Sequence, residues 1–203
     1  MLNIHQIKPK RTYTGERWRT NNSNKKRLAK DFNYRCGYCD DADFYSGGYN
    51  VYHVEHFAPK EKFENLQYTY ENLLYSCPYC NISKSNKWVG ATSDENILEA
   101  EGFVDPCDEE YDKHLKRTAN GKIIFITPVG SYMYRELKLY LKRHEIIHNL
   151  EKIRLRKKKI KEKIEIKKNA GIDCSNLEYI YRELCVHFSE YYDLMFEEEA
   201  VHN

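Results

Sequence analysis

The sequence lacks any long run of apolar residues. Its purely apolar stretches are only a few residues long, as at 123–126. A membrane-spanning helix needs about 20 such residues, so no membrane association is expected. The N-terminal residues also lack the apolar core of a secretory signal, and we therefore expect a cytoplasmic protein. A disordered polar chain is excluded, because the sequence holds 18 Tyr and 8 Phe.

A strong excess of one charge is lacking as well, since 33 Lys and Arg face 31 Asp and Glu. The average hides a segregation along the chain. Residues 1–35 hold ten basic and two acidic residues, residues 152–168 hold the same numbers, and the segment from residue 176 is acidic. The basic segments indicate either a nucleic-acid surface or internal pairing with the acidic segment. Charge alone does not separate these interpretations.

Disulfides are not expected, because the seven cysteines are odd in number and nothing indicates secretion. Four of them form the pairs Cys36-x-x-Cys39 and Cys77-x-x-Cys80, with 37 residues between the pairs. Each pair can present two thiolates to one ion, and two pairs complete a closed tetrahedral site typical of structural zinc. Such a site leaves no position for water, so this zinc is not expected to be catalytic. The alternative is four unrelated buried thiols.

Hydrophobic periodicity predicts an α+β protein that becomes helical toward its C-terminal end. Strands are expected over 49–56 and within 120–127, where an Asn-Gly turn precedes the apolar run. The predicted helices cover residues 25–32, 133–144, 146–164 and 177–195. Gly171 separates the last two, so a hairpin of one basic and one acidic helix is expected.

The segment between the cysteine pairs, together with the second pair, carries further polar residues in a defined order. In chain order these are Glu55-His56, Pro59, Asn72-Leu73 and Cys77-Pro-Tyr-Cys80-Asn81-Ile-Ser-Lys84. This order resembles the HNH (ββα-metal) endonuclease family in its four-cysteine form, over about residues 30–90. The resemblance implies a zinc-stapled ββα core with an N-terminal basic arm and C-terminal helices added to it.

The resemblance also implies a metal-dependent endonuclease that hydrolyses phosphodiester bonds. His56 would be the general base, a role that suits a side chain with an ordinary pKa near 6.5. Glu55 and Asn81 would hold a catalytic Mg²⁺ or Mn²⁺ through oxygen ligands. Asn72 would hold the loop and orient His56, and Lys84, one helical turn after Asn81, would contact nucleic acid.

Two positions depart from the family pattern. Ser85 stands where some members, the colicin nucleases among them, have a further His, and this disfavours a His-rich transition-metal site. Glu55 stands where Asp is commoner, and its longer side chain changes the reach of the carboxylate.

A wider resemblance, carried by Gly102-Phe-Val-Asp105-Pro106 and the elements after it, links the chain to HNH proteins of Septu-type and some retron phage-defence systems. Those proteins occur beside an ATPase, so an ATPase partner is expected here, with DNA as the substrate. The basic arm is predicted to contact nucleic acid through Lys8, Lys10, Arg11, Arg17 and Arg19. The predicted division is an arm with a short helix at 1–30, a nuclease core at 31–90 and a mostly helical extension at 91–203.

Two other functions remain open at this point. A zinc-stabilised module could bind nucleic acid without cutting it, but such a module would not require Glu55, His56 and Asn81 together. An HNH toxin could cleave RNA, and the residues do not distinguish an RNA substrate from DNA.

Overall fold

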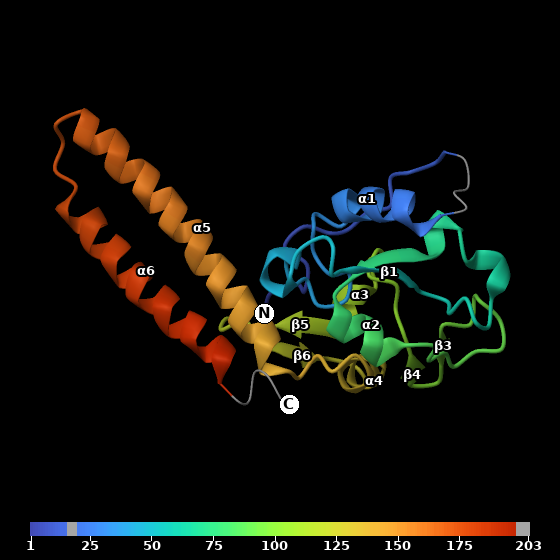
Figure 1. Cartoon of the computed structure of the whole chain (residues 1–203). Helices are drawn as coiled ribbons and strands as arrows, with labels where there is room; N and C mark the ends of the chain where they lie inside the picture. The colour runs from blue at the N-terminus through green and yellow to red at the C-terminus, as the bar shows by residue number, and fades with distance from the viewer. Residues whose placement is uncertain (16–19, 198–203) are drawn as a thin grey trace. The chain divides into compact units, whose positions relative to one another are not determined.

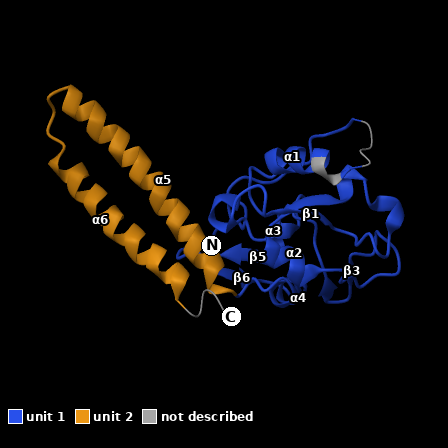
Figure 2. Cartoon of the chain, in the orientation of Figure 1, with its two compact units in different colours: residues 1–140 blue, residues 141–203 orange. Residues whose placement is uncertain are grey.

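The computed structural model of the protein describes residues 1–15 and 20–197, which divide into two compact units. Unit 1 covers residues 1–140 and unit 2 covers residues 141–203 (Figure 2). The sequence divided the chain differently, at residues 30 and 90. Residues 91–140 fold as part of the unit that holds the predicted nuclease core.

The centre of unit 1 is a ββα arrangement, as predicted. Strand β1 (His53–His56) pairs antiparallel with β2 (Leu73–Ser76), and helix α2 (Pro78–Lys84) follows β2 directly (Figure 1). Cys77 caps α2, since its Sγ accepts a hydrogen bond from the Cys80 N–H, and Pro78 occupies the first turn where no donor is needed. Strand β1 is shorter than the strand predicted over residues 49–56.

The long connection between β1 and β2 contains two 3₁₀ turns, η2 (Glu64–Leu66) and η3 (Tyr70–Asn72). Another 3₁₀ turn, η1 (Asp43–Ser46), precedes β1. Helix α1 (Asn21–Asp31) packs against both strands, and its residues Leu28 and Ala29 are fully buried. It overlaps the predicted helix 25–32, but begins four residues earlier and ends one residue earlier.

The N-terminal residues, predicted as an extended arm, are attached to unit 1. Leu2 bridges to Arg117, Ile4 is buried, and the His5 Nε2 atom lies 2.6 Å from the Gly37 carbonyl oxygen. The Leu2 bridge thus joins the start of the chain to the strand that contains Arg117, and the His5 contact joins it to the segment that carries the first cysteine pair.

Small paired elements complete unit 1. Two short hairpins are formed by β3 (Ile97–Leu98) with β4 (Glu101–Gly102), and by β5 (Leu115–Arg117) with β6 (Ile123–Phe125). The second hairpin confirms the strand predicted within 120–127. Helices α3 (Tyr111–His114) and α4 (Pro128–Glu136) flank it in the chain.

Unit 2 is the predicted helical hairpin. Helix α5 (Lys142–Asn169) and helix α6 (Ser175–Asp193) lie side by side, and a 3₁₀ turn, η4 (Leu194–Phe196), follows (Figure 1). Gly171, at φ 67°, lies in their connection, where its missing side chain permits a left-handed backbone. The helix predicted over 133–144 is wrong at its centre, because Lys138 has φ 54° and separates α4 from α5.

Within the described residues, no helix is both long enough and apolar enough to cross a bilayer.

Candidate metal centres and nuclease cleft

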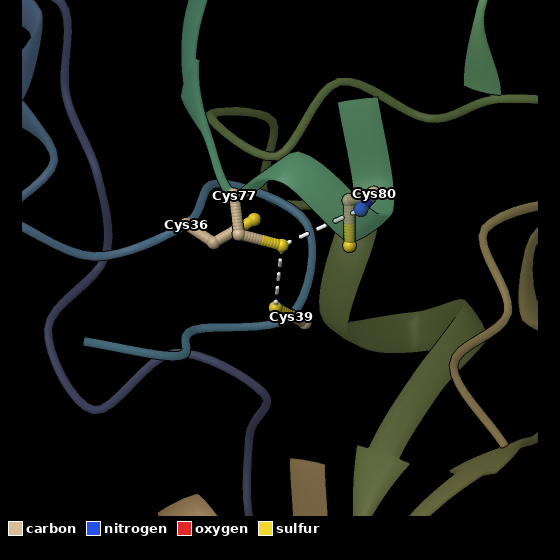
Figure 3. A group of neighbouring side chains, drawn as sticks. All are labelled: Cys36, Cys39, Cys77 and Cys80. Atoms are coloured by element: carbon tan, nitrogen blue, oxygen red, sulfur yellow. Dashed lines mark hydrogen bonds between the residues drawn. The ribbon is translucent and has the colours of Figure 1, made fainter. Parts of the chain in front are cut away.

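The four paired cysteines converge on one point. Cys36 and Cys39 come from the turn after α1, whereas Cys77 and Cys80 come from the start of α2 (Figure 3). All four are buried, and their Sγ atoms lie within 4.8 Å of one another. A zinc ion with bonds of about 2.3 Å to four sulfurs in a tetrahedron would separate the sulfurs by about 3.8 Å. The Cys39–Cys77 separation of 3.9 Å agrees with that geometry.

Backbone hydrogen bonds shape the first cysteine pair into a tight turn. The Asp40 N–H donates to the Cys36 carbonyl at 2.9 Å, and the Gly37 N–H donates to the Tyr75 carbonyl of β2 at 2.8 Å. The buried guanidinium of Arg117 donates to the Cys39 carbonyl. Both pairs are therefore fixed by the fold, and the donor set of four thiols fits a closed zinc site.

His56 ends β1 with its ring held in one orientation. Its Nε2 atom lies 2.9 Å from the Gln67 carbonyl oxygen. A carbonyl oxygen only accepts hydrogen bonds, so Nε2 carries the hydrogen and Nδ1 keeps a lone pair. Burial lowers the pKa of His56 below its ordinary value, although the bond to Gln67 acts in the opposite direction. The lowered pKa favours the neutral imidazole, the state that a general base requires.

Asn72 closes the loop that follows His56. Its Oδ1 accepts from the Ala58 N–H at 2.8 Å, and its Nδ2 donates to the carbonyls of Ala58 at 2.9 Å and Leu66 at 3.4 Å. Leu66 precedes Gln67, whose carbonyl contacts the His56 ring. Asn72 thus acts on the loop backbone, and its contacts agree with the holding role that the family resemblance implies.

Glu55 and Lys84 form a buried ion pair beside His56. The Lys84 Nζ lies 2.9 Å from Glu55 Oε1 and donates to the His56 carbonyl at 3.1 Å. Burial raises the pKa of Glu55 to about 7, against the opposing effect of the Lys84 ammonium. Lys84 itself is 0% exposed, which argues against the phosphate contact predicted from the sequence.

The spacing along α2 could have indicated that Lys84 is buried. Lys84 follows the zinc-site residue Cys80 by four positions, and residues four apart lie on the same side of a helix. By contrast, the Gln67 carbonyl that contacts His56 has no sequence signal, because every residue carries a carbonyl.

Glu55, His56 and Asn81 line one cleft of about 480 Å³ between β1, the following loop and α2. The residues that line it are Val54, Glu55, His56, Pro59, Lys60, Glu61, Asn81, Ile82, Ser85 and Asn86. A carboxylate and an amide oxygen are the hard donors that Mg²⁺ and Mn²⁺ prefer, so these residues fit the predicted cation. Lys60 and Glu61 belong to the cleft although sequence reasoning did not select them.

Some arm residues that were predicted to contact nucleic acid are bonded to other groups of the protein. The Arg11 guanidinium forms a bidentate pair with Asp105 and donates to the Leu73 carbonyl at 2.8 Å. Lys8 donates to the Asp108 carbonyl. Lys10 is exposed, whereas Arg17 and Arg19 fall outside the described residues. The side chains of two of the three described arm residues thus make contacts within unit 1.

Comparison with known proteins agrees with this geometry. Residues 36–87 match the family model described as HNH endonuclease. The chain is 29% identical over 119 residues to Septu protein PtuB of Bacillus mycoides (strain KBAB4), over 48% of this chain and 39% of that protein. The chain thus spans about two fifths of the length of the curated relative. No solved structure matches the chain.

The resemblance found in the sequence is therefore confirmed for the segment that carries both cysteine pairs and the β1–β2–α2 core, and residues 36–87 are an HNH-family domain.

Proposed function

We propose that the protein is a metal-dependent HNH endonuclease that cleaves DNA in a Septu-type phage-defence system. The proposal rests on one observation, which is that Glu55, His56 and Asn81 line a single cleft. A module that only binds nucleic acid has no need to gather a neutral imidazole and two oxygen donors at one point.

In the proposed reaction, His56 Nδ1 takes a proton from the attacking water. The bond between Nε2 and the Gln67 carbonyl keeps the ring in the required tautomer and stabilises the imidazolium that forms. Asn72 is a positioning residue, because it fixes the loop that supplies this carbonyl.

Glu55 and Asn81 would hold Mg²⁺ or Mn²⁺ beside the scissile phosphate. When bound, the cation supplies charge stabilisation for the phosphate and the leaving oxygen. Lys84 keeps the Glu55 carboxylate in place from the side of Oε1. The four cysteines would hold a structural zinc that fixes α2 to the turn after α1 and takes no part in hydrolysis.

The biological role is proposed from the relative. The similarity to Septu protein PtuB supports a role in phage defence. An ATPase partner is part of the same proposal, since the Septu-type resemblance of the sequence implies one.

The experiment compares His56→Ala with His53→Ala in the full chain. Both substitutions remove a histidine from β1, but His53 is exposed and does not line the cleft. Cleavage of supercoiled DNA and of RNA is measured with Mg²⁺ or Mn²⁺. We expect His56→Ala to lose activity by roughly 10²–10⁴-fold and His53→Ala to keep it.

Equal activity of wild type and His56→Ala would overturn the assignment. Binding of nucleic acid without cleavage by the wild type would favour the non-catalytic module. Cleavage of RNA alone would replace DNA as the substrate.

A further inference from the structure

Helix α5 carries an exposed row of four basic residues along one flank. Lys152, Arg156, Lys159 and Lys163 are four, three and four positions apart, so they lie on one side of the helix. All four are exposed. The row, called the α5 basic stripe below, is about 16 Å long at about 1.5 Å per residue.

The opposite flank of α5 is also basic but is balanced by acids. Arg154 forms an ion pair with Glu151 at 3.7 Å. Lys158 and Lys161 each have a glutamate four positions later, at Glu162 and Glu165. Side chains on a helix meet at spacings of three or four positions. At these spacings from the stripe residues, the sequence has one acidic residue, Glu162, three positions after Lys159, and it also lies four positions after Lys158. The two flanks therefore differ in net charge although they share one helix.

Helix α6 does not neutralise the stripe. The Lys157 Nζ lies 4.6 Å from the centre of the Phe188 ring, which identifies the face of α5 that meets α6. Each of the four stripe residues lies at least about 100° around the helix axis from Lys157, and therefore on a different side of α5. Over the described part of unit 2, the ion pair observed between α5 and α6 joins Lys168 to Glu178, and neither belongs to the stripe.

We propose that the α5 basic stripe binds the phosphodiester backbone of the nucleic acid on which the cleft acts. This inference rests on the proposed nuclease function. Basic side chains at positions 152 and 156, and at 159 and 163, repel each other across one helical turn. A polyanion relieves that repulsion, and a duplex carries roughly ten phosphate charges along the length of the stripe. Contacts of Lys and Arg to phosphates carry no sequence information, so we expect binding through the stripe to be independent of sequence.

The contrast with the N-terminal arm supports this location. Lys8 and Arg11 of the arm are bonded to acidic and carbonyl groups of unit 1, so their charges are already partly compensated. Among the described residues, no ion pair is observed for the four stripe residues. The stripe is thus the stronger candidate for counterion release on binding.

The test uses two triple variants of the full chain that are matched in composition. Arg156→Gln, Lys159→Gln and Lys163→Gln neutralise the stripe. Arg154→Gln, Lys158→Gln and Lys161→Gln remove the same residue types from the opposite flank. Both sets are placed in the His56→Ala background, and binding of a labelled 30-bp duplex is measured over a range of salt concentrations. Glutamine is a good helix former, so helicity by circular dichroism should match in both.

We expect the stripe variant to bind the duplex about tenfold or more weakly near 0.15 M salt. The slope of log affinity against log salt should fall by about 2.7, which is 0.9 for each lost contact. The opposite-flank variant should change the slope by less than about 1. Equal losses in the two variants, or no loss in either, would overturn the proposal.

The same proteins separate this inference from the proposed activity. If His56→Ala still cleaves DNA but the stripe variant loses the salt slope, the catalytic assignment fails and the stripe stands. If wild-type protein binds anionic phosphatidylglycerol vesicles or an acidic protein through the stripe, and binds no duplex, the stripe serves another partner and the inference fails.

Discussion

The ββα core buries a positive charge beside a negative one, whereas helix α5 exposes positive charges to solvent. In the core, Lys84 is 0% exposed and its ammonium contacts both Glu55 and the His56 carbonyl. On α5, the four stripe lysines and arginines are exposed and repel each other. A buried charge needs its partner to keep the fold stable, whereas an exposed charge can be removed at little cost. The core therefore fixes the geometry of the cleft, and α5 offers charge to a ligand.

The largest effect is expected for Cys77→Ser, which removes a zinc ligand but keeps a side chain that can cap α2. Structural zinc contributes about 10–16 kcal/mol in small zinc domains, comparable with the whole stability of a domain. We expect loss of bound zinc and loss of cooperative unfolding.

The control for Cys77→Ser is Cys107→Ser, at a half-buried cysteine outside the four-sulfur cluster. Elemental analysis and thermal unfolding check both variants. Zinc retained at one ion per chain in Cys77→Ser would contradict the assigned ligand set.

The next largest effect is expected for Lys84→Met. This change leaves the buried Glu55 carboxylate without its partner, and such a loss costs about 3–5 kcal/mol. Lys87→Met is the matched control, because Lys87 pairs with Glu136 at 2.8 Å near the surface and should cost under about 1 kcal/mol.

Urea unfolding measures both lysine variants. The double variant Lys84→Met with Glu55→Gln should recover part of the loss, because the unpaired charge is then gone. Similar losses for Lys84→Met and Lys87→Met would show that burial does not distinguish the two lysines.

A smaller loss is expected for Asn72→Ala. The change removes the hydrogen bonds of the Asn72 side-chain amide to Ala58 and Leu66. Buried backbone groups then lack partners, which lowers the free energy of unfolding by about 1–3 kcal/mol. Hydrogen exchange should increase in the loop over residues 58–71 more than in α5. Unchanged hydrogen exchange in that loop would contradict the proposal that Asn72 positions His56.

The smallest effect is expected on α5. Lys159→Gln removes one exposed charge from a row of like charges and should change the free energy of unfolding by under about 0.5 kcal/mol, in the stabilising direction. Urea unfolding at low salt is the appropriate measurement. A loss above about 1 kcal/mol would mean that Lys159 has a structural partner.

The sequence predicted the parts of the site that depend on local spacing. Each Cys-x-x-Cys pair carries its geometry within a few residues, so the four-sulfur cluster could be anticipated from spacing. The ββα core was expected only from the family resemblance. Contacts between distant segments could not be anticipated. The buried Arg117 donates to the Cys39 carbonyl from 78 positions away, and Arg11 forms an ion pair with Asp105.

The helical end of the chain shows the same limit. Apolar spacing predicted α5 and α6, since each has a long periodic stripe. It also continued through residues 137–141, where the left-handed Lys138 interrupts the helix although Leu137 and Leu139 are buried. Residues 137–141 remain apolar because some of them are buried, although they are not helical. The apolar pattern therefore continues across the break, and periodicity alone does not reveal it.

Chemical rescue of His56→Ala tests the central claim most directly. The cleft of about 480 Å³ beside His56 has room for a free imidazole. With Mg²⁺ or Mn²⁺ present, added imidazole should restore DNA cleavage by His56→Ala at least about tenfold, because it replaces the missing base. It should not restore Asn81→Ala, which lacks a proposed cation ligand. Cleavage by His56→Ala at the wild-type rate, or equal responses of the two variants to imidazole, would contradict the assignment of His56 as the base.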